Sequence, residues 1–167
     1  MKTLIVTRHA KSSWNDDTLS DFQRPLNKRG RQDAPVMAER LRTRGPKPEL
    51  ILSSTALRAL ETSELLLVPL ALKKEHLLTT DSIYEAPLSA LEKAVTTLPD
   101  HISVAMLVGH NPGVSSLGDF LCSSSHLQMP TCAMACFELD VDRWHDAYRD
   151  CAVLSWYDYP GNNTGSE

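Results

Sequence analysis

The chain has 167 residues, of which 42% are hydrophobic and 23% are charged. These are ordinary globular values, and they exclude a disordered, collagenous or coiled-coil chain. The net charge of -4 argues against a protein whose partner is nucleic acid or a membrane surface. No apolar run is long enough for a membrane span, and the N-terminus lacks the features of a signal peptide. We therefore expect a cytoplasmic protein with one domain at residues 1–160 and a disordered tail at 161–167.

In the first half of the chain, the hydrophobic pattern predicts strands that alternate with helices. Residues 3–7 are apolar and β-branched, as in a buried strand, and the polar residues 11–23 form a long loop. Apolar residues recur at helical spacing through 27–44, where Pro35 predicts a kink or a later start of the helix. The next elements expected are a strand at 49–53 and a helix at 55–68, capped by Ser54 or Thr55.

The second half of the chain continues the alternation. We expect a third strand at 73–79, a helix at 88–98, a fourth strand at 103–108, a helix at 112–121 with Asn111 as its N-cap and Pro112 at its first position, and strands at 131–139 and 152–157. This order predicts an α/β fold. We expect a three-layer sandwich, in which a mostly parallel central sheet of about six strands carries helices on both faces.

Side chains with useful chemistry follow three of these strands. Arg8 and His9 end the first strand, Arg58 lies in the helical turn after the second, and His110 follows the fourth. Ligands bind at the carboxyl ends of such strands, and two guanidinium groups near a helix N-terminus match the oxygens of a phosphate. A neutral imidazole can attack phosphorus, while a protonated one would stabilise the transferring oxygens. The pattern predicts a site for phosphoryl transfer.

The sequence contains none of the common metal or nucleotide motifs. It has no HxH or HExxH pair, no acidic pair at ligand spacing, no Walker loop, no GxGxxG and no GxSxG. We therefore expect no metal and no cofactor.

Four segments resemble signatures of a known family. They are RHAKSSWN at 8–15, DFQRPLNKRG at 21–30, SSTALRALET at 53–62 and VGHNPG at 108–113. In the same order, they are similar to the RHG, D(F/H)xRPL, SPxxRAxET and VGHNPG segments of the histidine phosphatase superfamily, which includes cofactor-dependent phosphoglycerate mutases. The RHA triplet and the short chain resemble the SixA-type branch of small phosphohistidine phosphatases. The resemblance implies a single histidine-phosphatase domain at 1–160.

The resemblance also implies roles for individual residues. His9 is similar to the nucleophile that becomes phosphohistidine, and Arg8, Arg58 and His110 are similar to the other members of the phosphate pocket. Asn15 matches a position that can touch the phosphoryl group, although a loop-capping role is an alternative. Arg24 belongs to the second segment, where it either contacts substrate or buttresses the loop.

The proton donor departs from the family pattern. Larger relatives carry a glutamate on an inserted region for which this chain is too short, and the nearest candidate is Glu85, otherwise a surface residue of a loop. An alkoxide leaving group needs a proton donor, whereas imidazole leaves readily from phosphohistidine. The expected partner is therefore a protein carrying phosphohistidine, or else a small phosphate ester.

Three functions stay open from the sequence. They are a phosphohistidine phosphatase, a general phosphatase for small phosphate esters and a phosphate-binding module without turnover. Whether Glu85 reaches the leaving-group side of the pocket would separate the first two. The presence of both His9 and His110 argues against the third, because a binding module needs no nucleophile.

Overall fold

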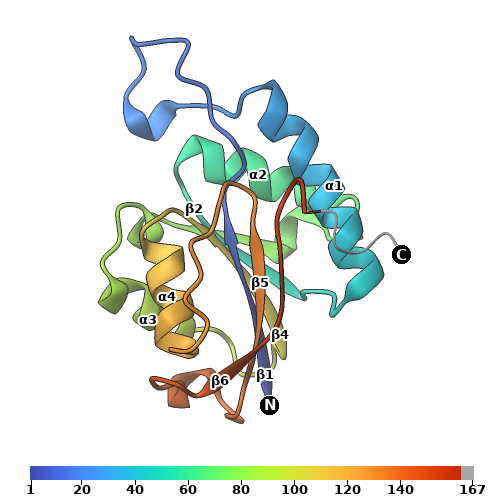
Figure 1. Ribbon diagram of the computed structural model, residues 1–167, viewed down its shortest axis with the longest axis vertical. Coiled ribbons are helices and arrows are strands. Elements are labelled where there is room, and N and C mark those ends of the chain that lie inside the picture. Colours follow the sequence, from blue (N-terminus) through green and yellow to red (C-terminus); the bar gives the residue numbers. More distant parts are fainter. Residues whose placement is uncertain (163–167) are drawn as a thin grey trace.

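A computed structural model describes residues 1–162 and contains one sheet of six strands (Figure 1). The strand order is β3-β2-β4-β1-β5-β6, and the four strands from β3 to β1 are mutually parallel while β5 runs antiparallel to both of its neighbours. The strands are β1 (Lys2–Arg8), β2 (Leu50–Ser54), β3 (Leu77–Thr80), β4 (Val104–Gly109), β5 (Met134–Leu139) and β6 (Ala152–Asp158). The predicted α/β class and mostly parallel sheet are confirmed.

Four α-helices cover the two faces of the sheet (Figure 1). They are α1 (Lys28–Arg44), α2 (Leu57–Leu67), α3 (Leu88–Thr96) and α4 (Gly113–Leu121). Side chains alternate across β1, so that Leu4 and Val6 pack in the core that contains α3 and α4, whereas Ile5 packs in the core of α1 and α2. No helix of the described chain is long and apolar enough to span a membrane.

Two predicted strands are too long at their N-terminal ends. Residues 73–79 do not form one strand, because Lys74–His76 is a 3-10 turn that the Nδ1 atom of His76 closes by accepting from the Lys73 amide at 2.9 Å. The strand predicted at 131–139 begins only at Met134. Before it, Cys132 adopts a φ of 62° and its amide donates to the carbonyl of His9 at 3.0 Å.

Three helices begin one or two residues later than predicted. Helix α1 begins at Lys28, where Asn27 caps it through the Gly30 amide at 2.8 Å, so Pro35 does not delay its start. The N-cap position of α2 is Ala56 instead of Ser54 or Thr55, although the Ser54 hydroxyl accepts from the Ala56 amide at 3.2 Å.

Helix α4 begins one residue later than predicted, with Pro112 in place of Asn111 at its N-cap position. The Asn111 amide group donates to the carbonyl of Met129 at 2.8 Å and accepts from the Ser115 hydroxyl at 2.7 Å. Asn111 thus ties the turn after β4 to the segment that precedes β5. Of the predicted tail at 161–167, residues 163–167 lie outside the described part of the chain.

Candidate active site

The register of β1 and β4 brings two histidines together at one edge of the sheet. Arg8 lies opposite Gly109 in this parallel pair, so the residues that follow them are neighbours. The His9 amide donates to the Gly109 carbonyl at 3.0 Å, and the ring centres of His9 and His110 are 5.1 Å apart. Arg58 comes from the first turn of α2, which follows β2 at the same edge. The structure therefore brings together the four residues that the strand ends predicted.

The ring of His9 is held in one tautomer. Its Nδ1 atom lies 2.7 Å from the carbonyl oxygen of Ala10, which can only accept a hydrogen bond. The proton is therefore on Nδ1, and Nε2 carries the lone pair. The Ala10 backbone is itself fixed, because its amide donates to the Thr62 hydroxyl at 2.9 Å.

Burial of His9 lowers its pKa to about 3, and the positive surroundings of Arg58 and Arg8 act in the same direction. The hydrogen bond to Ala10 opposes this shift without reversing it. At neutral pH the ring is uncharged, so its nucleophilic nitrogen is available without prior loss of a proton.

His110 is also neutral in this environment. Burial, and then the charge of Arg58, lower the pKa of His110 to about 4. Its Nε2 atom lies 2.8 Å from the Ser54 hydroxyl, and its Nδ1 atom is buried without a hydrogen-bond partner in the described chain. A protonated ring at this position would stabilise the oxygens of a transferring phosphoryl group. A phosphoryl dianion beside His110 would favour that charged form, because an opposite charge raises the pKa of an imidazole.

These shifts predict how acid affects the stability of the fold. Both pKa values lie below the ordinary 6.5, so in acid the unfolded chain binds protons that the folded chain does not. The free energy of unfolding is therefore highest above about pH 6.5 and falls as the pH drops towards 4 for His110 and towards 3 for His9. The loss is up to about 2 kcal/mol per group between pH 6.5 and 5.

Urea unfolding at both pH values checks this prediction. His110→Asn should lose less stability than the wild type between them. His101→Asn, which changes an exposed histidine, should lose as much as the wild type. Equal losses in all three proteins would contradict the shift.

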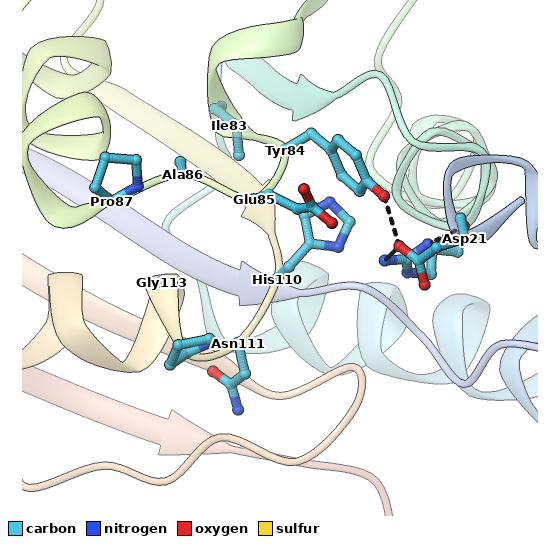
Figure 2. A pocket seen from close by; sticks show the side chains of 11 residues that line it. Asp21, Ile83, Tyr84, Glu85, Ala86, Pro87, His110, Asn111 and Gly113 are labelled. Atoms are coloured by element: carbon cyan, nitrogen blue, oxygen red, sulfur yellow. Dashed lines mark hydrogen bonds and ion pairs between the residues drawn. The ribbon is translucent and has the colours of Figure 1, made fainter.

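Asp21 and Tyr84 complete the surroundings of Arg58, and sequence reasoning assigned no role to either. The Asp21 carbonyl accepts from Arg58 Nη1 at 2.6 Å, and the Asp21 carboxylate accepts from Arg58 Nη2 at 3.0 Å. The Tyr84 hydroxyl donates to the same carboxylate oxygen at 2.6 Å (Figure 2). Their neighbours in the sequence were the available signal, since Asp21 opens the second family segment and Tyr84 precedes Glu85.

The other guanidinium of the site, that of Arg8, has fewer partners. Its Nη1 atom donates to the Met129 carbonyl at 3.1 Å, and its Nε atom is buried without a partner in the described chain. Burial, followed by the charge of Arg58, lowers the pKa of Arg8. Two cations close enough to repel each other in this way are suited to an anion between them.

Arg24 fixes the loop that carries Asp21. It donates to the Ser13 carbonyl at 3.0 Å, to the Asp21 carboxylate at 3.0 Å and to the Ser12 hydroxyl, and it stacks on the Trp14 ring. The buttressing alternative for Arg24 therefore fits the structure.

The base of the same loop lies directly against helix α1. A Cβ atom on Gly30 would lie 2.2 Å from the carbonyl oxygen of Lys11, so this contact requires glycine. Asn15 lies in the exposed part of the loop, where its backbone amide donates to the Ser13 hydroxyl at 3.1 Å. It does not line the cavity described next.

A cavity of about 520 Å³ opens beside Arg58 and His110 (Figure 2). Asp21, Tyr84 and Glu85 also line it, whereas Arg8 and His9 are not among its lining residues. His9 is 6% exposed and lies beside the cavity, next to His110. The arrangement offers space for a leaving group next to the imidazole and guanidinium groups.

Glu85 reaches this cavity but is not held there. Its side chain is exposed, and it makes no hydrogen bond or ion pair with another described residue. Its backbone has a φ of 49°, in the left-handed region that is uncommon for a residue with a side chain. Nothing in these surroundings orients the carboxyl group towards a reacting atom.

Within residues 1–162, no group of three or more histidine, cysteine, aspartate or glutamate side chains is arranged to hold a metal ion. The charges that face an anion in this site are those of arginine side chains.

Comparisons with known proteins agree with the fold and with the motifs. A sequence model of the histidine phosphatase superfamily (branch 1) matches residues 4–96. An uncharacterized chloroplastic protein of Arabidopsis thaliana is 32% identical over 164 residues, which cover 93% of this chain and 74% of that protein.

Two solved structures are similar over nearly the whole chain. One is the protein histidine phosphatase SixA complexed with tungstate, with a TM-score of 0.81 and 22% identity over 95% of this chain and 97% of that one. The other is a SixA protein of Agrobacterium tumefaciens, with a TM-score of 0.79 and 25% identity over 96% of this chain and 99% of that one. By its sequence, its fold and these relatives, the chain belongs to the histidine phosphatase superfamily and is a phosphatase.

Proposed function

We propose that this phosphatase hydrolyses phosphohistidine, as a SixA-type enzyme, through a covalent intermediate on His9. The observation that carries the proposal is the state of His9, which is neutral, has its proton fixed on Nδ1 and lies beside Arg58, Arg8 and His110. In the first step, Nε2 of His9 forms a bond to phosphorus while the bond from phosphorus to the substrate nitrogen breaks, and the substrate ring, protonated by solvent on its other nitrogen, leaves as neutral imidazole. Water then attacks phosphorus, which releases inorganic phosphate and restores His9.

The other residues of the site bind the phosphoryl oxygens in this proposal. Arg8 and Arg58 supply charged donors, and His110 supplies a donor that gains charge as the anion binds. Arg58 makes no hydrogen bond through Nε within the described chain, so this donor and the second hydrogens of its Nη atoms remain for a ligand. Asn15 stays a prediction without a supporting contact, because it lies in the exposed loop.

The choice of phosphohistidine over an ester rests on the leaving group. A general acid must be positioned within hydrogen-bond reach of the leaving atom, and the exposed Glu85 is not held by any neighbour. Imidazole leaves from phosphorus without the strong proton donor that an alkoxide needs. The name of the related SixA structure from Agrobacterium tumefaciens, which refers to phosphohistidine, points the same way.

The proposed partner is therefore a protein with a phosphorylated histidine. A cytoplasmic location stays a prediction, and one relative is named as chloroplastic.

A second candidate is a phosphatase for small phosphate esters, and one observation favours it. Glu85 lines the same cavity as Arg58 and His110, and the cavity of about 520 Å³ is large enough for a small molecule. If Glu85 turned towards the leaving oxygen, it could protonate an alkoxide.

Glu85→Gln separates the two candidates. For a phosphohistidine phosphatase we expect little change in the rate with phosphohistidine, because imidazole does not depend on this acid. For an ester phosphatase the same change should slow an alkyl phosphate by about 10²-fold or more. Steady-state rates on both substrates measure the difference, and Glu92→Gln, outside the cavity, is the matched control.

The proposed function itself is tested with a substrate panel. A histidine-phosphorylated protein, p-nitrophenyl phosphate and a phosphoserine peptide are compared by kcat/KM under one set of conditions. We expect the phosphohistidine protein to be the best substrate. A preference for the phosphoserine peptide would overturn the proposal in favour of ester hydrolysis, and turnover of none of them would support the binding module instead.

A further inference from the structure

The cavity beside Arg58 has an unusual balance of charge for a site that binds an anion. Asp21 and Glu85 contribute acidic side chains to its lining, and Arg58 is the single arginine or lysine among the described residues that line it. His110, the other basic side chain there, has its pKa lowered to about 4, with burial as the largest cause. If Arg58 binds the phosphoryl group of a ligand, the lining offers no second arginine or lysine for another negative group of that ligand.

The charge of Arg58 is already balanced by Asp21. The side chain of Arg58 is 8% exposed, and it donates both to the carbonyl and to the carboxylate of Asp21. A buried guanidinium needs such a partner, because burial of an unpaired charge is costly. Among the residues that line the cavity, the formal charges are those of Arg58, Asp21 and Glu85, which sum to one net negative charge, since Arg8 and Arg24 are not part of the lining.

The Asp21 carboxylate is fixed in place and ionised. Besides Arg58, it accepts from Tyr84 at 2.6 Å and from Arg24 at 3.0 Å. These bonds, led by that of Tyr84, lower the pKa of Asp21 to about 2. When a phosphoryl group binds Arg58, the bonds from Tyr84 and Arg24 still hold the carboxylate at the wall of the cavity.

We propose that Asp21 is a specificity-determining residue, which makes this cavity reject leaving groups that carry a negative charge. A neutral or cationic leaving group, such as the imidazole of a histidine side chain, is not repelled by these acidic side chains, so the phosphoryl group is the only anion that the cavity must accept. A phosphate ester of an acidic metabolite would place a second anion near Asp21 and Glu85. The inference rests on the proposed function for the position of the phosphoryl group beside Arg58.

The test uses two ligands of nearly equal size that differ by one charge. Phosphonoacetamide and phosphonoacetate both carry a phosphonate, followed by a neutral amide or by a carboxylate. Their dissociation constants are measured by isothermal titration calorimetry for the wild type, for Asp21→Asn and for Asp17→Asn. Asp17 is an exposed residue of the same loop that does not line the cavity, so its change alters the net charge equally.

We expect the wild type to bind phosphonoacetamide about 10-fold more tightly, which is the scale of repulsion between two partly screened charges several ångströms apart. Asp21→Asn should reduce this preference by about 3- to 10-fold, and Asp17→Asn should leave it unchanged. A thermal melt establishes that Asp21→Asn is folded. The wild type also provides a measurement that needs no variant, because added salt should weaken its preference.

Equal binding of the two ligands by the wild type, or a preference that Asp21→Asn leaves intact, would overturn the inference. The readout is binding, so it is separate from the substrate panel. A charge preference without turnover of phosphohistidine would refute the proposed function alone, whereas turnover without the preference would refute the role of Asp21 alone. Failure of both ligands to bind would refute the phosphate site beside Arg58 on which the inference depends.

Discussion

The His9→Ala variant should lose turnover by about four orders of magnitude or more, because it has no nitrogen to attack phosphorus. The substitution should leave the fold intact. His9 lies just after the end of β1, and the removed ring contacts the ring of His110. Initial rates with a histidine-phosphorylated protein measure the loss, and circular dichroism with a thermal melt measures the fold.

A trapping experiment identifies the same residue directly. Phosphohistidine survives alkali, so a reaction with labelled substrate that is quenched in alkali should carry its label on His9. His101→Ala provides the control, since His101 is exposed and precedes β4 at the far end from His110. A label on another residue, or an active His9→Ala protein, would refute the assignment of His9 as the nucleophile.

The His110→Ala variant is expected to lose about 10²- to 10³-fold in kcat on every substrate, the usual cost of removing a preorganised donor to a developing charge. The loss should not depend on the leaving group, because in the proposed mechanism His110 donates to the phosphoryl oxygens that all substrates share. Rates on a phosphohistidine protein and on p-nitrophenyl phosphate measure this dependence.

Ser54→Ala is the matched variant for His110, because the Ser54 hydroxyl lies 2.8 Å from Nε2 of the ring. Ser54→Ala should lower kcat less than His110→Ala does, since the imidazole ring of His110 itself remains. If the loss in His110→Ala were confined to one leaving group, His110 would act on that group as a proton donor, and its role would be the one considered above for Glu85.

The order of strands and helices was predictable because it depends on patterns that are local in the sequence. Alternating or continuous apolar runs of the right length identified each strand, and apolar spacing identified each helix. The predicted starts of β3 and β5 were wrong because, just before each strand, a backbone amide donates to a polar group instead of to a neighbouring strand. The His76 ring closes a 3-10 turn ahead of β3, and the turn at Cys132 places its amide on the His9 carbonyl.

The sequence by itself determined that Arg8, His9, Arg58 and His110 meet at one edge of the sheet. Arg8 and Arg58 lie near the ends of β1 and β2, and parallel strands place their carboxyl ends at the same edge of a sheet. The histidines that follow β1 and β4 meet there for the same reason, so their positions in the chain were enough to predict a phosphate pocket.

Only the tertiary structure decided the charges within that pocket. Asp21 is 37 residues from Arg58 and 63 from Tyr84 in the chain, and no periodic pattern connects such distant residues. The neutral state of His9 and His110 arises from burial and from nearby arginines, which exist only once the strands and α2 have packed. Local patterns record how each element forms, whereas protonation depends on what surrounds a group in three dimensions.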